Sequence, residues 1–240
     1  MIEFGHAPEI WRDFPDLAAG CLYVTGVTAD AGVGDRVQRF CGVADERLAA
    51  GPESELPEVR AWRRAFARMG LKPTRYRCAA ESLARRYRKE RALPSLHPLV
   101  DLCNAVSLAF AVPVAVLDAD RVSWPLRMRY ADGDERYLPF AGGEETPYPG
   151  EVVYADTAGH AHARRWTHRQ SAASAVRPDT TSAMVVAEAM HETGRADVAR
   201  LFDTLAAELA EVWRPPATTA ELTPAAPRFT ASRRPGSARG

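Results

Sequence analysis

The stretch of sequence that decides the fold runs from residue 93 to residue 120 and reads LPSLHPLVDLCNAVSLAFAVPVAVLDAD. Between Pro98 and Ala111 it is bounded by prolines and is apolar around most of a helical circumference, which predicts a buried central helix. After Pro113, the β-prone run at 114–117 predicts a buried strand. A buried helix therefore leads directly into a buried strand.

Three polar side chains interrupt the apolar surface of this predicted helix. Asp101, Asn104 and Ser107 stand three residues apart, so they form one polar stripe along the helix. Buried polar groups need hydrogen-bond partners. The stripe therefore either completes hydrogen bonds inside the protein or lines a pocket, and the second alternative makes Asp101 and Asn104 candidate site residues.

The segments before the central helix are predicted to be a β-rich part of the same domain, residues 1–56, followed by two basic helices. Strands are expected at 21–27 and 37–43. Helices are expected at 57–69 and 80–91, where apolar residues recur at three- and four-residue steps. A basic helix face is either simply solvated or contacts RNA phosphates. On the second helix the outward candidates for RNA binding are Arg85, Arg86, Arg88 and Lys89.

The second half of the chain is predicted to contain a sheet and two closing helices. The expected strands lie at 126–130, 136–140, 151–155 and 161–166. The expected helices lie at 180–190 and 196–213. Residues 215–240 are rich in Pro, Ala, Thr and Arg, a composition typical of a disordered tail.

Composition narrows the class of protein. A chain of 240 residues with 46% hydrophobic residues can bury a full core as one domain. There is no long apolar run and no signal-peptide pattern, so we expect a cytoplasmic protein without membrane contact. The four cysteines are scattered without a CxxC spacing, which indicates neither a disulfide framework nor a zinc site. His160 and His162 share a strand face, but no third ligand is evident, and no metal is expected.

Several motifs in order resemble the editing domain of the beta subunit of bacterial phenylalanyl-tRNA synthetase, usually called the B-three/B-four domain. The first is Val-Asp-x-x-Asn at 100–104, which leads through Pro113 to a strand ending in Asp-x-Asp at 118–120. Further similar segments are GEVVYAD at 150–156, RWTHRQS at 165–171 and the predicted helix around Glu188. The similarity runs from about residue 62 to residue 213.

The resemblance implies an α+β domain with a layered, sandwich-like β-sheet core flanked by helices, its core spanning 57–214. In the synthetase, a pocket at the junction of these layers hydrolyses tyrosine wrongly esterified to the phenylalanine tRNA. A bound water attacks the ester there, so the chemistry needs orienting polar groups but no covalent nucleophile, metal or other cofactor. The implied partner is aminoacyl-tRNA or tRNA, and no DNA contact is expected.

The resemblance carries the family's site residues over only in part. Asn104 matches the helix asparagine of the pocket, and Glu188 matches the acidic residue that contacts the substrate side chain. The family's histidine aligns with Ala115, and its pocket glycines fall near Gln170 and Ser171. These departures imply either a different acyl group or a pocket without catalysis.

The leading hypothesis is a trans-acting aminoacyl-tRNA deacylase. The alternatives are a non-catalytic module that binds tRNA or an amino-acid-like ligand, and a small-molecule esterase or amidase. Ligase activity alone is not expected, because the chain shows no nucleotide-binding loop. The candidate catalytic residues are Asn104, Gln170 and Glu188, and the candidate substrate-binding residues are Asp101, Arg169 and Ser171.

Overall fold

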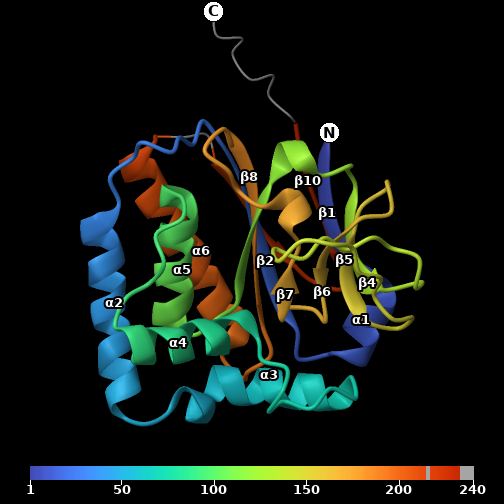
Figure 1. Cartoon of the computed structure of the whole chain (residues 1–240), viewed down its shortest axis with the longest axis horizontal. Coiled ribbons are helices and arrows are strands. Elements are labelled where there is room, and N and C mark those ends of the chain that lie inside the picture. The colour runs from blue at the N-terminus through green and yellow to red at the C-terminus, as the bar shows by residue number, and fades with distance from the viewer. Residues whose placement is uncertain (215–216, 233–240) are drawn as a thin grey trace, which may run out of the picture.

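The computed structural model describes residues 1–214 and 217–232, which form two β-sheets and six α-helices. The two sheets lie face to face, and two of the helices cover the outer face of one sheet (Figure 1). One apolar core fills the space between the sheets, and a second lies between the smaller sheet and its helices. This arrangement confirms the predicted α+β class with a layered sheet core.

The larger sheet has six strands in the order β10-β1-β4-β5-β6-β7. The first strand, β1, pairs parallel with β4 and antiparallel with β10, so the two ends of the described chain meet in this sheet. The strands are β1 (Ile2–His6), β4 (Leu126–Tyr130), β5 (Val152–Ala155), β6 (Ala161–Arg164), β7 (Arg169–Gln170) and β10 (Arg228–Ala231).

The smaller sheet has four antiparallel strands in the order β3-β8-β2-β9. Helices α5 and α6 pack on its outer face, and α2 covers α5 in turn (Figure 1). The strands are β2 (Ala18–Thr25), β3 (Val114–Asp118), β8 (Ser182–Ala189) and β9 (Ala217–Leu222). The helices are α1 (Pro8–Asp13), α2 (Gly34–Ala49), α3 (Pro57–Arg68), α4 (Ala79–Glu90), α5 (Pro98–Phe110) and α6 (Gly194–Val212), with 3-10 turns η1 (Glu53–Glu55), η2 (Ala119–Arg121) and η3 (Ala172–Ser174). No helix of the described residues is both long and apolar enough to span a membrane.

The central helix is confirmed as α5, and it begins at Pro98 as the sequence predicts. It ends where Ala111 adopts the left-handed conformation, with φ of 55°. The chain then turns through Pro113 into β3, which pairs with β8. Residues 93–120 therefore supply one strand of the smaller sheet, β3, and one helix that packs on that sheet, α5.

Two predicted elements have the wrong type of secondary structure. The predicted strand at 37–43 lies inside α2, whose buried residues Phe40, Ala44 and Leu48 recur every four residues. The predicted helix at 180–190 is the strand β8, which is paired on both sides and buried at all eight positions. A strand buried on both faces shows no alternation of polar and apolar residues, so its sequence is easily read as a buried helix.

Two further predictions differ from the structure. Residues 136–140 form only isolated bridges, from Arg136 and Tyr137, and not a hairpin strand. The predicted disordered tail contains β9 and β10, because edge strands need few apolar residues to pair. The rest of that predicted tail, residues 215–216 and 233–240, lies outside the described residues.

Candidate functional site

Glu188 lies on the strand β8 and reaches across the core toward the six-stranded sheet, with only 1% of its surface exposed. One carboxylate oxygen lies 2.6 Å from Nε2 of His6. The other accepts hydrogen bonds from the hydroxyl of Tyr154 and from the indole N–H of Trp166, the latter at 2.8 Å. Burial, together with this carboxylate, raises the pKa of Tyr154 well above its ordinary value, so the hydroxyl remains a donor. Three side chains therefore fix the carboxylate.

A tight turn between β6 and β7 brings Trp166 to Glu188. Arg165 and Trp166 both have left-handed backbones, with φ of 49° and 58°, which is uncommon for residues other than glycine. The indole ring packs edge-on against Trp62 and Phe14, with ring centroids 5.1 Å and 4.8 Å away. An unfavourable backbone conformation held in place by core packing is found more often at functional positions than elsewhere.

A small cavity lies beside Glu188, between the two sheets. Its volume, counted as the space open to the centre of a water molecule, is about 60 Å³. A space of that size has room for more than one water molecule. Its apolar wall includes Ala115 and Val186. Its polar lining residues are Tyr154, Thr167, His168, Arg169, Gln170 and Glu188.

Gln170 and Arg169, two of the residues selected from the sequence, lie in this lining. The side-chain amide of Gln170 donates a hydrogen bond to the carbonyl of Val116 at 2.7 Å. Among the described residues, the second amide N–H and the amide oxygen have no partner, so both remain for a ligand. Arg169 pairs loosely with Glu145 at 3.3 Å and keeps 37% of its side chain exposed.

Thr167 and His168 also line the cavity, although neither is among the site residues that the sequence predicts. The hydroxyl of Thr167 is buried without a hydrogen-bond partner among the described residues. Nδ1 of His168 lies 2.8 Å from the carbonyl of Arg77. The sequence feature that indicates them is their position next to Gln170, inside the segment 165–171 that resembles the editing domain.

The structure places three other candidates outside this lining. Asp101 accepts hydrogen bonds from Ser95 and from the backbone of Leu96 and so closes the loop before α5. Ser171 is fully buried and exchanges hydrogen bonds with the backbone of residue 138. Asn104 is half-buried on α5, and among the described residues its side chain has no hydrogen-bond partner. The polar stripe of α5 is thus not brought together with Gln170 and Glu188 at the cavity.

The candidate RNA-binding residues on α4 are exposed, but most of them pair with acids. Arg88 lies 3.0 Å and Arg85 3.7 Å from Glu53, and Arg86 lies 2.7 Å from Glu90. The remaining candidate, Lys89, has no carboxylate within ion-pair distance among the described residues. Two carboxylates thus partly neutralise the four basic candidates of this helix face.

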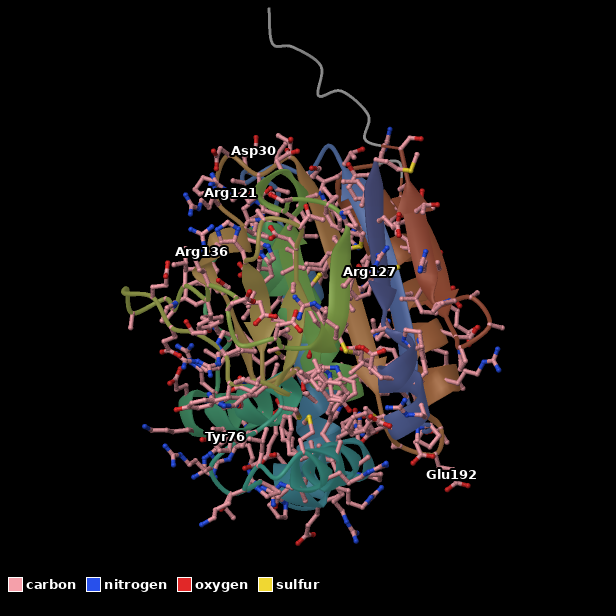
Figure 2. The ribbon with its side chains drawn as sticks, turned by 90° about the vertical axis from the view of Figure 1, so that its right-hand side faces the viewer. Asp30, Tyr76, Arg121, Arg127, Arg136 and Glu192 are labelled. Carbon is pink, nitrogen blue, oxygen red and sulfur yellow. The ribbon has the colours of Figure 1, made fainter. Side chains whose placement is uncertain are left out.

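A different cationic cluster lies beside the cavity. The guanidinium carbons of Arg75 and Arg165 lie 5.3 Å and 4.9 Å from the ring centre of Tyr76, and that ring packs edge-on against His168. We call Arg75, Tyr76 and Arg165 the Tyr76 cluster. Figure 2 shows Tyr76 at the lower surface of the molecule, next to the helices α3 and α4. Arg75 is exposed and has no carboxylate partner among the described residues.

Metal ligands are a second kind of site to consider. Glu58, His191 and Asp197 are buried, with one potential ligand atom from each within 4.8 Å of the others. Arg47 already pairs with Glu58 and Arg200 with Asp197, so the two carboxylates are neutralised by arginine. A divalent cation would have to bind beside these two positive charges, which disfavours it.

The fold and the site define an α+β domain that holds a small polar cavity between two facing sheets. The chain belongs to the B3/4 domain family, whose model matches residues 61–207, and this match confirms the resemblance seen in the sequence. A search of curated proteins found no match. Among solved structures, an N-terminal fragment of the phenylalanyl-tRNA synthetase beta subunit from Pyrococcus horikoshii is similar, with 10% identity and a TM-score of 0.49. The alignment covers 92% of this chain and 54% of that fragment, so the chain spans about half of its length.

Proposed function

We propose that this protein binds the acylated 3′ end of a tRNA at the Glu188 cavity and hydrolyses the aminoacyl ester in trans. The observation that carries the proposal is the convergence of Gln170 and Glu188 on one cavity of a B3/4 domain. Ester hydrolysis by water needs polar groups that orient the water and stabilise the developing oxyanion. The free N–H of the Gln170 amide supplies one such donor.

For Glu188 we propose a role other than the contact with the substrate side chain that the resemblance implies. Three protein donors already fill three of the roughly four acceptor positions of its carboxylate, which leaves little capacity for a direct hydrogen bond to a substrate side chain. Its buried carboxylate instead places negative potential at the cavity wall. That potential favours the α-ammonium group of an aminoacyl ester over a neutral acyl group.

The size of the cavity limits the substrate. A cavity of about 60 Å³ is small beside ligand pockets of about 300–1,000 Å³. The terminal ribose and base do not fit inside. We therefore propose that only the acyl group enters, and that the nucleotide stays at the rim.

The Tyr76 cluster is the part of the rim best suited to that nucleotide. Single-stranded RNA ends are bound by aromatic rings and arginine planes that stack bases, with cations that contact phosphates. Tyr76, with Arg75 and Arg165 over its ring, combines both features next to the lining residue His168. Arg165 is paired with Glu151 at 3.5 Å, so Arg75 is the arginine of the cluster best suited to contact a phosphate, and the paired arginines of α4 are less suited to this role.

A deacylation assay tests the proposal. The purified protein is incubated with a panel of tRNAs charged with amino acids of increasing size, and release of the amino acid is followed. Ala115→Leu fills the cavity wall and should abolish release, whereas Ala210→Leu makes the same change on the exposed side of α6 and should not. Binding of every charged tRNA without release from any would remove the enzymatic proposal.

The non-catalytic alternative keeps one specific observation in its favour, which is Ala115 at the position of the family's histidine. In that case charged tRNA binds more tightly than uncharged tRNA, and Ala115→Leu removes the difference. A small-molecule esterase predicts a third result, since cleavage of simple esters would then proceed without salt-dependent binding of tRNA.

The RNA contact has its own test. Arg75→Ala should lower tRNA affinity and should reduce the slope of log K against log salt by about 0.7–0.9, the value for one phosphate contact. Arg86→Ala is the matched control, because Arg86 is paired with Glu90. Equal slopes for both variants would rule out the Tyr76 cluster as the phosphate contact.

A further inference from the structure

His168 lies in the turn between β6 and β7 and lines the cavity beside Thr167, Gln170 and Glu188. Its ring is half-buried and packs edge-on against Tyr76, with centroids 5.3 Å apart and planes at 85°. The left-handed residues before it, Arg165 and Trp166, turn the chain at this point. The imidazole is therefore held at the boundary between the cavity and the Tyr76 cluster.

The hydrogen bond of His168 fixes its tautomer. Nδ1 lies 2.8 Å from the carbonyl oxygen of Arg77, and a carbonyl oxygen only accepts, so Nδ1 carries the proton. In the neutral ring the lone pair then belongs to Nε2. Among the described residues Nε2 has no hydrogen-bond partner, and it is not among the atoms shut off from solvent. A basic nitrogen is thus available beside the cavity.

The surroundings keep this ring neutral near pH 7. Burial lowers the pKa of His168, and the nearby guanidinium groups lower it further, whereas the carbonyl of Arg77 raises it. The balance places the pKa below its ordinary value. The charged or titratable groups around the ring are Arg164, Arg165 and Arg169 on its own hairpin, Tyr76 from the segment before α4, and Tyr154 and Glu188 across the cavity.

We propose that His168 is the general base that activates the hydrolytic water. This inference rests on the deacylase function proposed above. Nε2 takes a proton from water as the water oxygen bonds to the ester carbonyl carbon. The resulting tetrahedral species collapses, the bond from that carbon to the ribose oxygen breaks, and the ribose oxygen takes the proton back from the imidazolium. The products are the free amino acid and the 3′-terminal hydroxyl, with no other reactant.

The choice of variant follows from the tautomer. His168→Asn keeps an N–H near the position of Nδ1, so the hydrogen bond to Arg77 can persist, but it removes the lone pair of Nε2. A general base contributes about 10²–10⁴ in rate. We expect single-turnover deacylation to fall by about 10²-fold or more, with affinity for tRNA changed by less than about threefold.

The pH dependence separates catalysis from packing. In the wild type the rate should rise with pH to a plateau, with a midpoint below about 6.5, the ordinary value for histidine. His168→Asn should lose that limb of the profile. A variant with the wild-type rate and profile would overturn the role of His168 while leaving the deacylase function intact.

Two outcomes remain to be told apart. If the wild type releases no amino acid from any charged tRNA, the deacylase function fails and the role of His168 fails with it. If His168→Asn does not fold, nitrogen NMR of the wild type decides instead. A proton on Nε2 at neutral pH, or a wild-type rate without an acid limb at any pH where the protein stays folded, would overturn the proposal.

Discussion

Replacing Glu188 should destabilise the protein far more than its position at a cavity suggests. Glu188→Ala leaves three buried donors, on His6, Tyr154 and Trp166, without an acceptor. Each orphaned donor costs about 1–3 kcal/mol, which sums to about 3–9 kcal/mol. A whole domain is stable by only about 5–15 kcal/mol. We expect Glu188→Ala to be largely unfolded or close to unfolding at 37 °C.

Glu188→Gln is the matched control. Its amide oxygen can accept from both Tyr154 and Trp166, and its N–H can donate to Nε2 of His6 once the histidine proton moves to Nδ1. The charge is lost, and one buried donor, the N–H now on Nδ1 of His6, has no partner among the described residues, so the expected cost is about 1–3 kcal/mol, below that of three orphaned donors. Urea unfolding followed by far-ultraviolet circular dichroism measures both values. Equal losses in the two variants, or a loss below about 1 kcal/mol for Glu188→Ala, would refute the reasoning.

Three further changes test other parts of the structure. Gly20→Ala puts a Cβ 2.6 Å from the buried ring of Phe202, so we expect a loss of about 1–3 kcal/mol, visible as a lower Tm. Burial raises the pKa of Asp156, but hydrogen bonds from His162 and from backbone N–H groups lower it more, to below its usual value. The stability from this carboxylate is present above about pH 4 and lost as pH falls further, so the difference between wild type and Asp156→Asn in urea unfolding should shrink in acid. Asn104→Ala should reduce the rate of deacylation less than Gln170→Ala does, because Asn104 lies outside the cavity lining. Equal losses of rate in the two variants would show that Asn104 belongs to the site.

The helices were the part of the fold that sequence could predict best. Proline at the first turn and a regular apolar spacing mark α3 and α5, and the structure begins both helices at the expected proline. The strand β8 was missed because it is apolar on both faces, so its pattern has no period of two. The strands β9 and β10 were missed because their stability comes from pairing with β2 and β1, which lie at the other end of the chain.

The candidate site could be predicted only in part. The resemblance to the editing domain pointed to Gln170 and Glu188, and both line the cavity. The partners of Glu188 are 182, 34 and 22 residues away in sequence, and spacing rules do not reach that far. The sequence does not point to His168, because its tautomer depends on the backbone carbonyl of Arg77, which no side-chain pattern reveals.

The strands β1 and β2 pair with β10 and β9, which come last in the described chain, so the two sheets can be completed only after those strands are made. A ribosome delivers β1 and β2 first, and each then waits with an open edge until residues 217–231 have been made. Open strand edges are templates for association with other chains. Molecules that lack β9 and β10 should therefore expose the edges of β2 and β1 and aggregate.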